Sequence, residues 1–138
     1  MCDAVFFQQV GADKKIFFSQ RQAQLPLIDQ AGRVRWVAWG RRAAEPGVLP
    51  IGGWADLSSI RQKKWQAYFP KSVRIAVQSF REQHIEGAHH WFTVTPGSYI
   101  QGLLASDGLE SRVYVVTISP DAQDQHYWRW PRLLGGSS

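Results

Sequence analysis

Cysteine is almost absent from this chain of 138 residues, which contains only Cys2. A single cysteine excludes an internal disulfide framework and a zinc site built from several cysteines. The sequence also lacks any run of roughly 18 apolar residues, the length that spans a membrane. It has Asp3 where a secretory signal peptide would carry positive charge. We therefore expect a cytoplasmic protein with no membrane partner.

The signature of disorder is missing as well, because 44% of the residues are hydrophobic and only 20% are charged, as in ordinary globular proteins. No internal repeat or interior low-complexity linker divides the chain. Its length fits one compact domain. We expect a monomeric single domain over residues 1–134 and a flexible tail at residues 135–138.

Acidic residues are in the minority, since 11 Asp and Glu stand against 16 Lys and Arg and leave a net charge of +5. Between Leu57 and Phe80 there is no acidic residue, and the basic ones are Arg61, Lys63, Lys64, Lys71 and Arg74. The chain also holds seven tryptophans. Cationic grooves and aromatic faces together are typical of single-stranded nucleic acid binding. A tryptophan-rich core beneath a solvated basic surface is the alternative interpretation.

Short runs of alternating apolar and polar residues, separated by turn-forming residues, predict antiparallel strands. These lie at residues 5–9, 15–19, 24–28, 33–39, 73–80, 90–95, 99–105 and 112–118. Two prolines and three glycines predict a loop at residues 43–53. The predicted fold class is α+β with mostly antiparallel strands.

One main helix is expected to begin after Ser58 or Ser59, to end near Phe69 before Pro70, and to present Arg61, Lys63 and Lys64 on a basic side. These three cations are candidate phosphate contacts. A second, short helix is expected after Ser119, with His126 at or just past its end.

Cys2 is the first candidate for chemistry, because removal of Met1 would leave a cysteine with a free α-amine. Such a 1,2-aminothiol condenses with aldehydes. The amine forms an imine, and the thiol closes on it to give a stable thiazolidine ring. The alternative is that Cys2 is a small, buried and inert apolar residue.

Glu82 and His126 are the candidate acid and base. Glu82 follows a predicted strand and could carry protons, although it could equally be a surface glutamate. His126 lies among aromatic residues beside an arginine, which favours the neutral imidazole, and a structural role is the alternative. His89 and His90 are adjacent and would point to opposite faces of a strand, so we expect neither a metal site nor a cofactor.

Several short motifs occur in the order found in the SOS-response-associated peptidase (SRAP) family, and the chain resembles a short, divergent member of that family. The motifs are Met1-Cys2, Trp39-Gly40, Phe80-Arg81-Glu82, Gly102-Leu103, Tyr114-Val115-Val116-Thr117, and His126 with Arg129-Trp130-Pro131. Where members carry Asn-Ala-Arg-x-Glu, this chain has Gly52-Gly53-Trp54-Ala55-Asp56. The resemblance implies a barrel-like sheet core.

The resemblance also implies a function in DNA damage, namely binding of single-stranded DNA, crosslinking to abasic sites and peptidase self-processing. It implies that Cys2 is the nucleophile and the point of self-cleavage, that Glu82 is the proton shuttle, and that His126 opens the sugar or reverses the link. Phosphate candidates are Arg41, Arg42, Arg81 and Arg129, and stacking candidates are Trp39 and Trp128. The alternatives are a non-catalytic nucleic acid binding module and a tryptophan-rich protein-interaction module.

Overall fold

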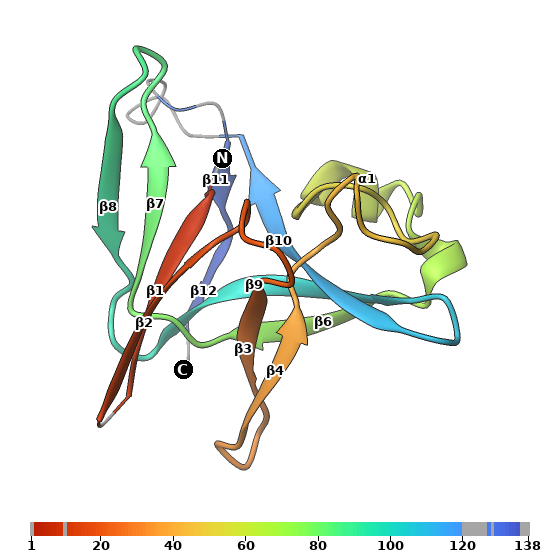
Figure 1. The fold of residues 1–138 in the computed structure, drawn as a ribbon, viewed down its shortest axis with the longest axis horizontal. Coiled ribbons are helices and arrows are strands. Elements are labelled where there is room, and N and C mark those ends of the chain that lie inside the picture. The colour runs from red at the N-terminus through yellow and green to blue at the C-terminus, as the bar shows by residue number, and fades with distance from the viewer. Residues whose placement is uncertain (1, 10, 120–126, 128, 136–138) are drawn as a thin grey trace.

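The computed structural model describes residues 2–9, 11–119, 127 and 129–135 (Figure 1). The strands are β1 (Ala4–Gln9), β2 (Ala12–Phe17), β3 (Gln24–Ile28), β4 (Val34–Ala38), β5 (Trp54–Asp56), β6 (Lys71–Ile75), β7 (Ser79–Gln83), β8 (His89–Thr93), β9 (Ser98–Ser106), β10 (Ser111–Ile118), β11 (Trp130–Pro131) and β12 (Leu133–Gly135). The helical elements are α1 (Leu57–Arg61) and the 3-10 turn η1 (Gln66–Tyr68). At this coarse level the sheet-rich, mostly antiparallel prediction is confirmed.

The smaller sheet has four antiparallel strands in the order β2-β1-β7-β8, at the left of Figure 1. Strand β1 lies inside it, and Ala4 is paired with Phe17 on one side and with Arg81 on the other. Ala4, Val5 and Phe7 are buried, whereas Phe6 and Gln8 on either side of Phe7 are less buried. This pairing fixes the beginning of the chain against β7.

The larger sheet has eight strands, with the order β11-β10-β9-β6-β3-β4 and with β5 and β12 attached to β10 and β9. Beyond the end of β4, Trp39 forms a bridge with Val113 of β10, and the Gly40 amide donates to the Val113 carbonyl at 2.8 Å. Strands β4 and β10 therefore meet, and the run β10-β9-β6-β3-β4 curls into a barrel-like closure.

Gly40 has a backbone φ of 54° at this closure. A Cβ atom at this position would lie 2.0 Å from the carbonyl oxygen of Gly52, which is too close for any side chain. The glycine of the Trp39-Gly40 motif thus has a steric explanation, because the chain and the following loop approach each other backbone to backbone.

The core has two parts. The first fills the space between the two sheets, and its fully buried large side chains include Val5, Leu25, Trp39, Ile75 and Phe80. The second lies under the helical segment and contains Leu49, Ala55, Trp65, Leu103, Ala105, Tyr114 and Val116. The two parts share the strands β9 and β10, so the helical segment is fixed to the barrel by its own apolar contacts.

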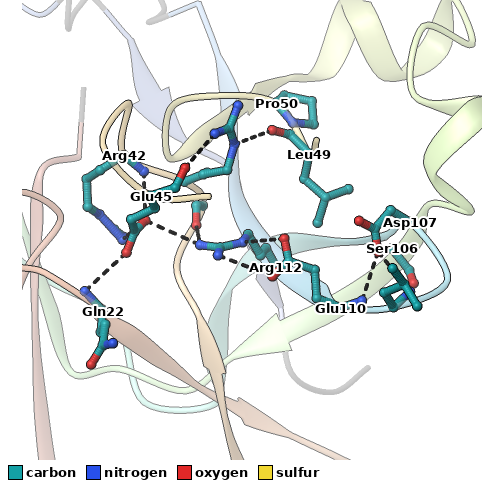
Figure 2. Close-up of polar contacts among 12 residues, drawn as sticks. Gln22, Arg42, Glu45, Leu49, Pro50, Ser106, Asp107, Glu110 and Arg112 are labelled. Atoms are coloured by element: carbon teal, nitrogen blue, oxygen red, sulfur yellow. Dashed lines mark hydrogen bonds and ion pairs between the residues drawn. The ribbon is translucent and has the colours of Figure 1, made fainter. Parts of the chain in front are cut away.

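The predicted loop at residues 43–53 is confirmed, and a buried ionic network holds it (Figure 2). Arg112 of β10 contacts Glu45 at 3.3 Å and Glu110 at 3.2 Å. Arg42 reaches the same Glu45 at 3.4 Å, and Arg41 donates to the carbonyl of Leu49 at 2.6 Å. Because these side chains are mostly covered, each charge depends on its partner.

The predicted long helix is wrong, because α1 ends at Arg61 and a turn follows. The N-cap is Asp56, whose side chain accepts from the Ser58 amide. Lys63 adopts a left-handed φ of 62°, which breaks the helix. The chain then folds back so that Trp65 packs 4.9 Å from the ring of Tyr114. Burial of this indole outweighs helix propensity.

The single strand predicted at residues 73–80 is two strands, β6 and β7, which belong to different sheets. Between them the Ala76 amide donates to Pro26 of the larger sheet, and the Gln78 amide donates to Phe6 of the smaller sheet. The apolar run is continuous because both sheets use it to fill one core. The short helix predicted after Ser119 lies outside the described residues.

Candidate functional site

Cys2 lies two residues before β1, with its side chain fully buried. Its thiol donates to the Ala4 carbonyl with a sulfur-oxygen distance of 3.7 Å. Its own carbonyl accepts from the indole N–H of Trp54 at 2.6 Å. Strand β5 therefore anchors the backbone of Cys2, a contact that the sequence did not predict.

Glu82, on β7, is also fully buried, so the surface interpretation of this residue is wrong. Antiparallel pairing of β1 with β7 brings it towards Cys2, and the Asp3 amide donates to the Arg81 carbonyl at 3.2 Å. The negative charge of Glu82 contributes to a raised pKa of the Cys2 thiol, after the larger effect of burial. The fold thus brings together two of the three candidate catalytic residues.

Burial raises the pKa of Glu82 to about 7, the positive charge of the N-terminus opposes this rise, and the nearby charge of Asp3 adds a smaller rise. Burial also raises the pKa of Cys2 well above its ordinary value. A carboxyl group with a pKa near the working pH can both donate and accept a proton. At neutral pH this site therefore combines a protonated thiol with a carboxyl group suited to moving protons.

Glu82 should make the stability of the protein depend on pH. Its pKa is raised from 4.5 to about 7, so the folded state keeps a proton that the unfolded state has released. This contribution is fully present below pH 4.5 and is lost as the pH rises to about 7, a loss of about 3 kcal/mol in unfolding free energy. Urea denaturation across this range should show the loss in the wild type, and Glu82→Gln should remove it. Equal slopes in both proteins would contradict the raised pKa.

Two histidines, His84 and His90, lie near Glu82 in the fold. Strand register places His90 of β8 directly opposite Glu82, and directly opposed residues share a face of the sheet. The His84 ring is 6.2 Å from that of His90 and 5.5 Å from that of Tyr127. The sequence signal that could have predicted this cluster is the spacing of two residues between Glu82 and His84, since residues two apart in an extended chain point to the same side. Among the described residues, no cluster of His, Cys, Asp and Glu could hold a metal ion.

Arg81 positions the chain start rather than presenting a free cation. Its guanidinium donates to both carboxylate oxygens of Asp3, at 3.0 and 2.7 Å, and lies 5.0 Å from the centroid of the Phe17 ring. The bidentate geometry is the strong form of this ion pair. Arg81 therefore fixes the residue next to Cys2.

Trp39 is fully buried and its indole N–H donates to the Gly53 carbonyl at 3.0 Å. It cannot offer a face to a base, so the stacking prediction for Trp39 is wrong. Arg41 and Arg42 are half-buried and hold the loop, with Arg42 also donating to the carbonyls of Phe18 and Trp39. Their guanidinium groups donate to backbone carbonyls of the protein instead of making the predicted phosphate contacts.

A cleft of about 480 Å³ brings together two predicted cations, Arg61 of α1 and Arg129. Arg129 forms an ion pair with Asp56 and donates to the Thr117 carbonyl at 3.1 Å. Arg61 is exposed, as are Lys63 and Lys64 on the following turn. Strand β5 connects the site of Cys2 with this cleft, because Trp54 contacts Cys2 and Asp56 borders the cleft.

His126 and Trp128 lie outside the described residues. In the part of the chain that is described, no helix has the length and apolar character needed to cross a membrane. Comparison of the chain with protein-family models, curated proteins and solved structures finds no match in any of the three.

Proposed function

We propose that this protein is a divergent SRAP-like protein that binds single-stranded DNA and bonds covalently to abasic sites through Cys2. The observation that carries the proposal is the placement of Cys2 beside Glu82 in a buried site, from segments far apart in the chain. The order of family-like motifs along the sequence supports it. The reaction requires a free amine on Cys2, so it follows removal of Met1 by self-processing.

The chemistry joins an aldehyde to an aminothiol. Hydrolysis of the Met1–Cys2 peptide bond consumes one water and frees the α-amine of Cys2. That amine attacks the aldehyde carbon of the ring-opened sugar, and loss of one water gives an imine. The sulfur then bonds to the imine carbon while the thiol proton passes to the nitrogen. The product is a thiazolidine, with no oxidation or reduction at any step.

Glu82 is suited to the proton transfers in this sequence. An abasic sugar is mostly a closed hemiacetal, so ring opening needs a proton delivered to one oxygen and removed from another. A carboxyl group with a pKa of about 7 is present in both forms at neutral pH. The raised pKa of Cys2 keeps the thiol protonated, which leaves the first attack to the amine.

The cleft between α1 and Arg129 is the proposed DNA contact. Arg61 lines this cleft, and Lys63 and Lys64 are exposed on the turn that follows α1. None of the ion pairs in the described part of the chain involves these three side chains. Phosphates are neutralised by such cations with release of counterions. Strand β5 then connects the phosphate contacts to the site of Cys2.

A non-catalytic single-stranded DNA binding module is the second candidate. The complete burial of Cys2 favours it, as does the absence of the Asn-Ala-Arg motif from residues 52–56. Both candidates predict DNA binding, so covalent bond formation distinguishes them.

The proposal predicts a covalent adduct with an abasic oligonucleotide. Protein verified by intact mass to lack Met1 should give a shifted band on a denaturing gel, and Cys2→Ala should give none. Arg61→Ala combined with Lys64→Ala should weaken binding and lower the slope of log affinity against log salt, by about 0.7 for each phosphate that is no longer neutralised. The matched control is Arg21→Ala, which alters an exposed arginine away from the cleft. It should change neither the DNA affinity nor the salt slope.

Two results would count against the proposal in different ways. A folded protein lacking Met1 that binds the abasic strand without forming an adduct over hours would leave the binding module. Failure to bind any single-stranded oligonucleotide at low salt would remove both candidates.

A further inference from the structure

A groove of about 660 Å³ opens between the β3–β4 hairpin and strand β6, away from the cleft described above. Strand β3 pairs with β6 only at Leu27–Ile75 and Ile28–Arg74. Beyond these pairs β6 and the hairpin diverge (Figure 1). The groove occupies the resulting opening and does not include Cys2 or Glu82.

The walls of the groove are strongly basic. Arg33 and Arg35 line it from the hairpin, and Lys71 and Arg74 line it from β6. All four residues are exposed. The one carboxylate in the lining, Asp29, lies 3.5 Å from Arg33 and also accepts from two amides of its own turn. The groove therefore carries excess positive charge on both sides.

The rest of the lining is largely aliphatic and consists of Leu27, Ile28, Val34, Val73 and Leu134. Val34 is 39% exposed, so apolar surface is available to a ligand. Aliphatic surface between cationic walls suits a ligand that alternates negative charge with apolar groups.

Strand β6 also offers backbone to such a ligand. Residues 71–73 of β6 pair with β9 on one side. On the other side the described strands leave them unpaired, because β3 pairs only with the two residues that follow. An open strand edge is a site where an extended peptide can add as a further strand.

We propose that this groove binds an extended acidic peptide segment of a partner protein. Its carboxylates contact Arg35 and Lys71 on the opposite walls, its apolar side chains lie on the aliphatic floor, and its backbone pairs with β6. A nucleic acid fits less well, because the groove offers bases only guanidinium faces for stacking, no aromatic residue lines it, and its floor is aliphatic. The inference is independent of the proposed function.

The test uses a fluorescein-labelled peptide of eight residues in which aspartate alternates with leucine or valine. Anisotropy should show binding to the full chain. The double variant Arg35→Glu with Lys71→Glu should raise the Kd about tenfold or more, because two attractions become repulsions. The matched control is Arg61→Glu with Lys64→Glu, which makes the same charge change on exposed residues in and after α1, outside the groove, and should leave the Kd unchanged.

Further measurements separate the contributions. A peptide with serine in place of leucine and valine should bind more weakly to the wild type, and Val34→Ser should remove most of that difference. Amide chemical shifts should change at residues 71–73 when the peptide binds. The variants should keep the wild-type melting temperature, since all the altered side chains are exposed.

Equal affinity for a lysine-containing peptide, or an equal rise in Kd in both double variants, would overturn the proposal. Displacement of the peptide by single-stranded DNA, with the displacement abolished in Arg35→Glu and Lys71→Glu, would also overturn it and assign the groove to nucleic acid. Because adduct formation depends on Cys2 and the other cleft, failure here leaves the proposed function standing, and the reverse is also true.

Discussion

Glu82→Gln is expected to slow formation of the abasic-site adduct by about 10² to 10⁴-fold, the usual contribution of a positioned acid or base. Glutamine has nearly the same shape as glutamate but does not exchange a proton. The variant should fold, because it removes an ionisable group from a fully buried position and no desolvated charge remains. DNA affinity should stay within about twofold, since Glu82 is not in the cleft of Arg61 and Arg129.

The measurement is the single-turnover rate of adduct formation on a denaturing gel, at several pH values. The wild-type rate should change around pH 7, where Glu82 titrates, and this inflection should be absent from the variant. Glu86→Gln is the matched control, because the Glu86 side chain is 84% exposed on the turn after β7. A variant that keeps both the wild-type rate and the wild-type pH profile would assign the proton transfers to another group.

The sequence predicted which residues belong to the candidate site better than it predicted their surroundings. Cys2 and Glu82 were found from their chemistry and from the order of motifs. Burial of Cys2 was the alternative interpretation of that residue, and the structure agrees with it. The burial of Glu82 was not predicted, because a glutamate after an apolar run carries no periodic signal. The pairing of β1 with β7 brings the two residues near each other, while β5 contacts Cys2 and β8 pairs with Glu82. Such long-range pairing cannot be read from local patterns.

Tertiary packing also explains the errors at the arginines and tryptophans. Arg41 and Arg42 follow a strand in a basic stretch, which is typical of a solvated face. In the structure the closure of β4 on β10 turns them towards the loop and Glu45. Trp39 becomes core for the same reason. By contrast, Arg61, Lys63 and Lys64 are exposed as predicted, although their helix is much shorter.

Arg112→Met is expected to lower the free energy of unfolding by about 3 kcal/mol, the lower end of the cost of breaking a buried ion pair. Arg112 is 9% exposed and contacts Glu45 and Glu110 while donating to the Gly40 carbonyl at 2.8 Å (Figure 2). Methionine can fill the volume but supplies no donor. Glu45 would keep only its contacts with Arg42 and the backbone, so part of its charge would be buried without compensation.

Two further variants identify the buried charge as the cause of this destabilisation. Glu110→Gln should cost less than about 1 kcal/mol, because the Glu110 side chain is 35% exposed and water can replace the arginine. Adding Glu45→Met to Arg112→Met should restore part of the stability, since it removes a mostly covered charge that has lost one of its two arginine partners. Urea denaturation at pH 7 measures these three variants and Glu45→Met alone. The contradicting result is a double variant that is less stable than Arg112→Met by the full cost of Glu45→Met alone. The two side chains would then act independently, and the loop would be held by the hydrogen bonds from arginines to backbone carbonyls.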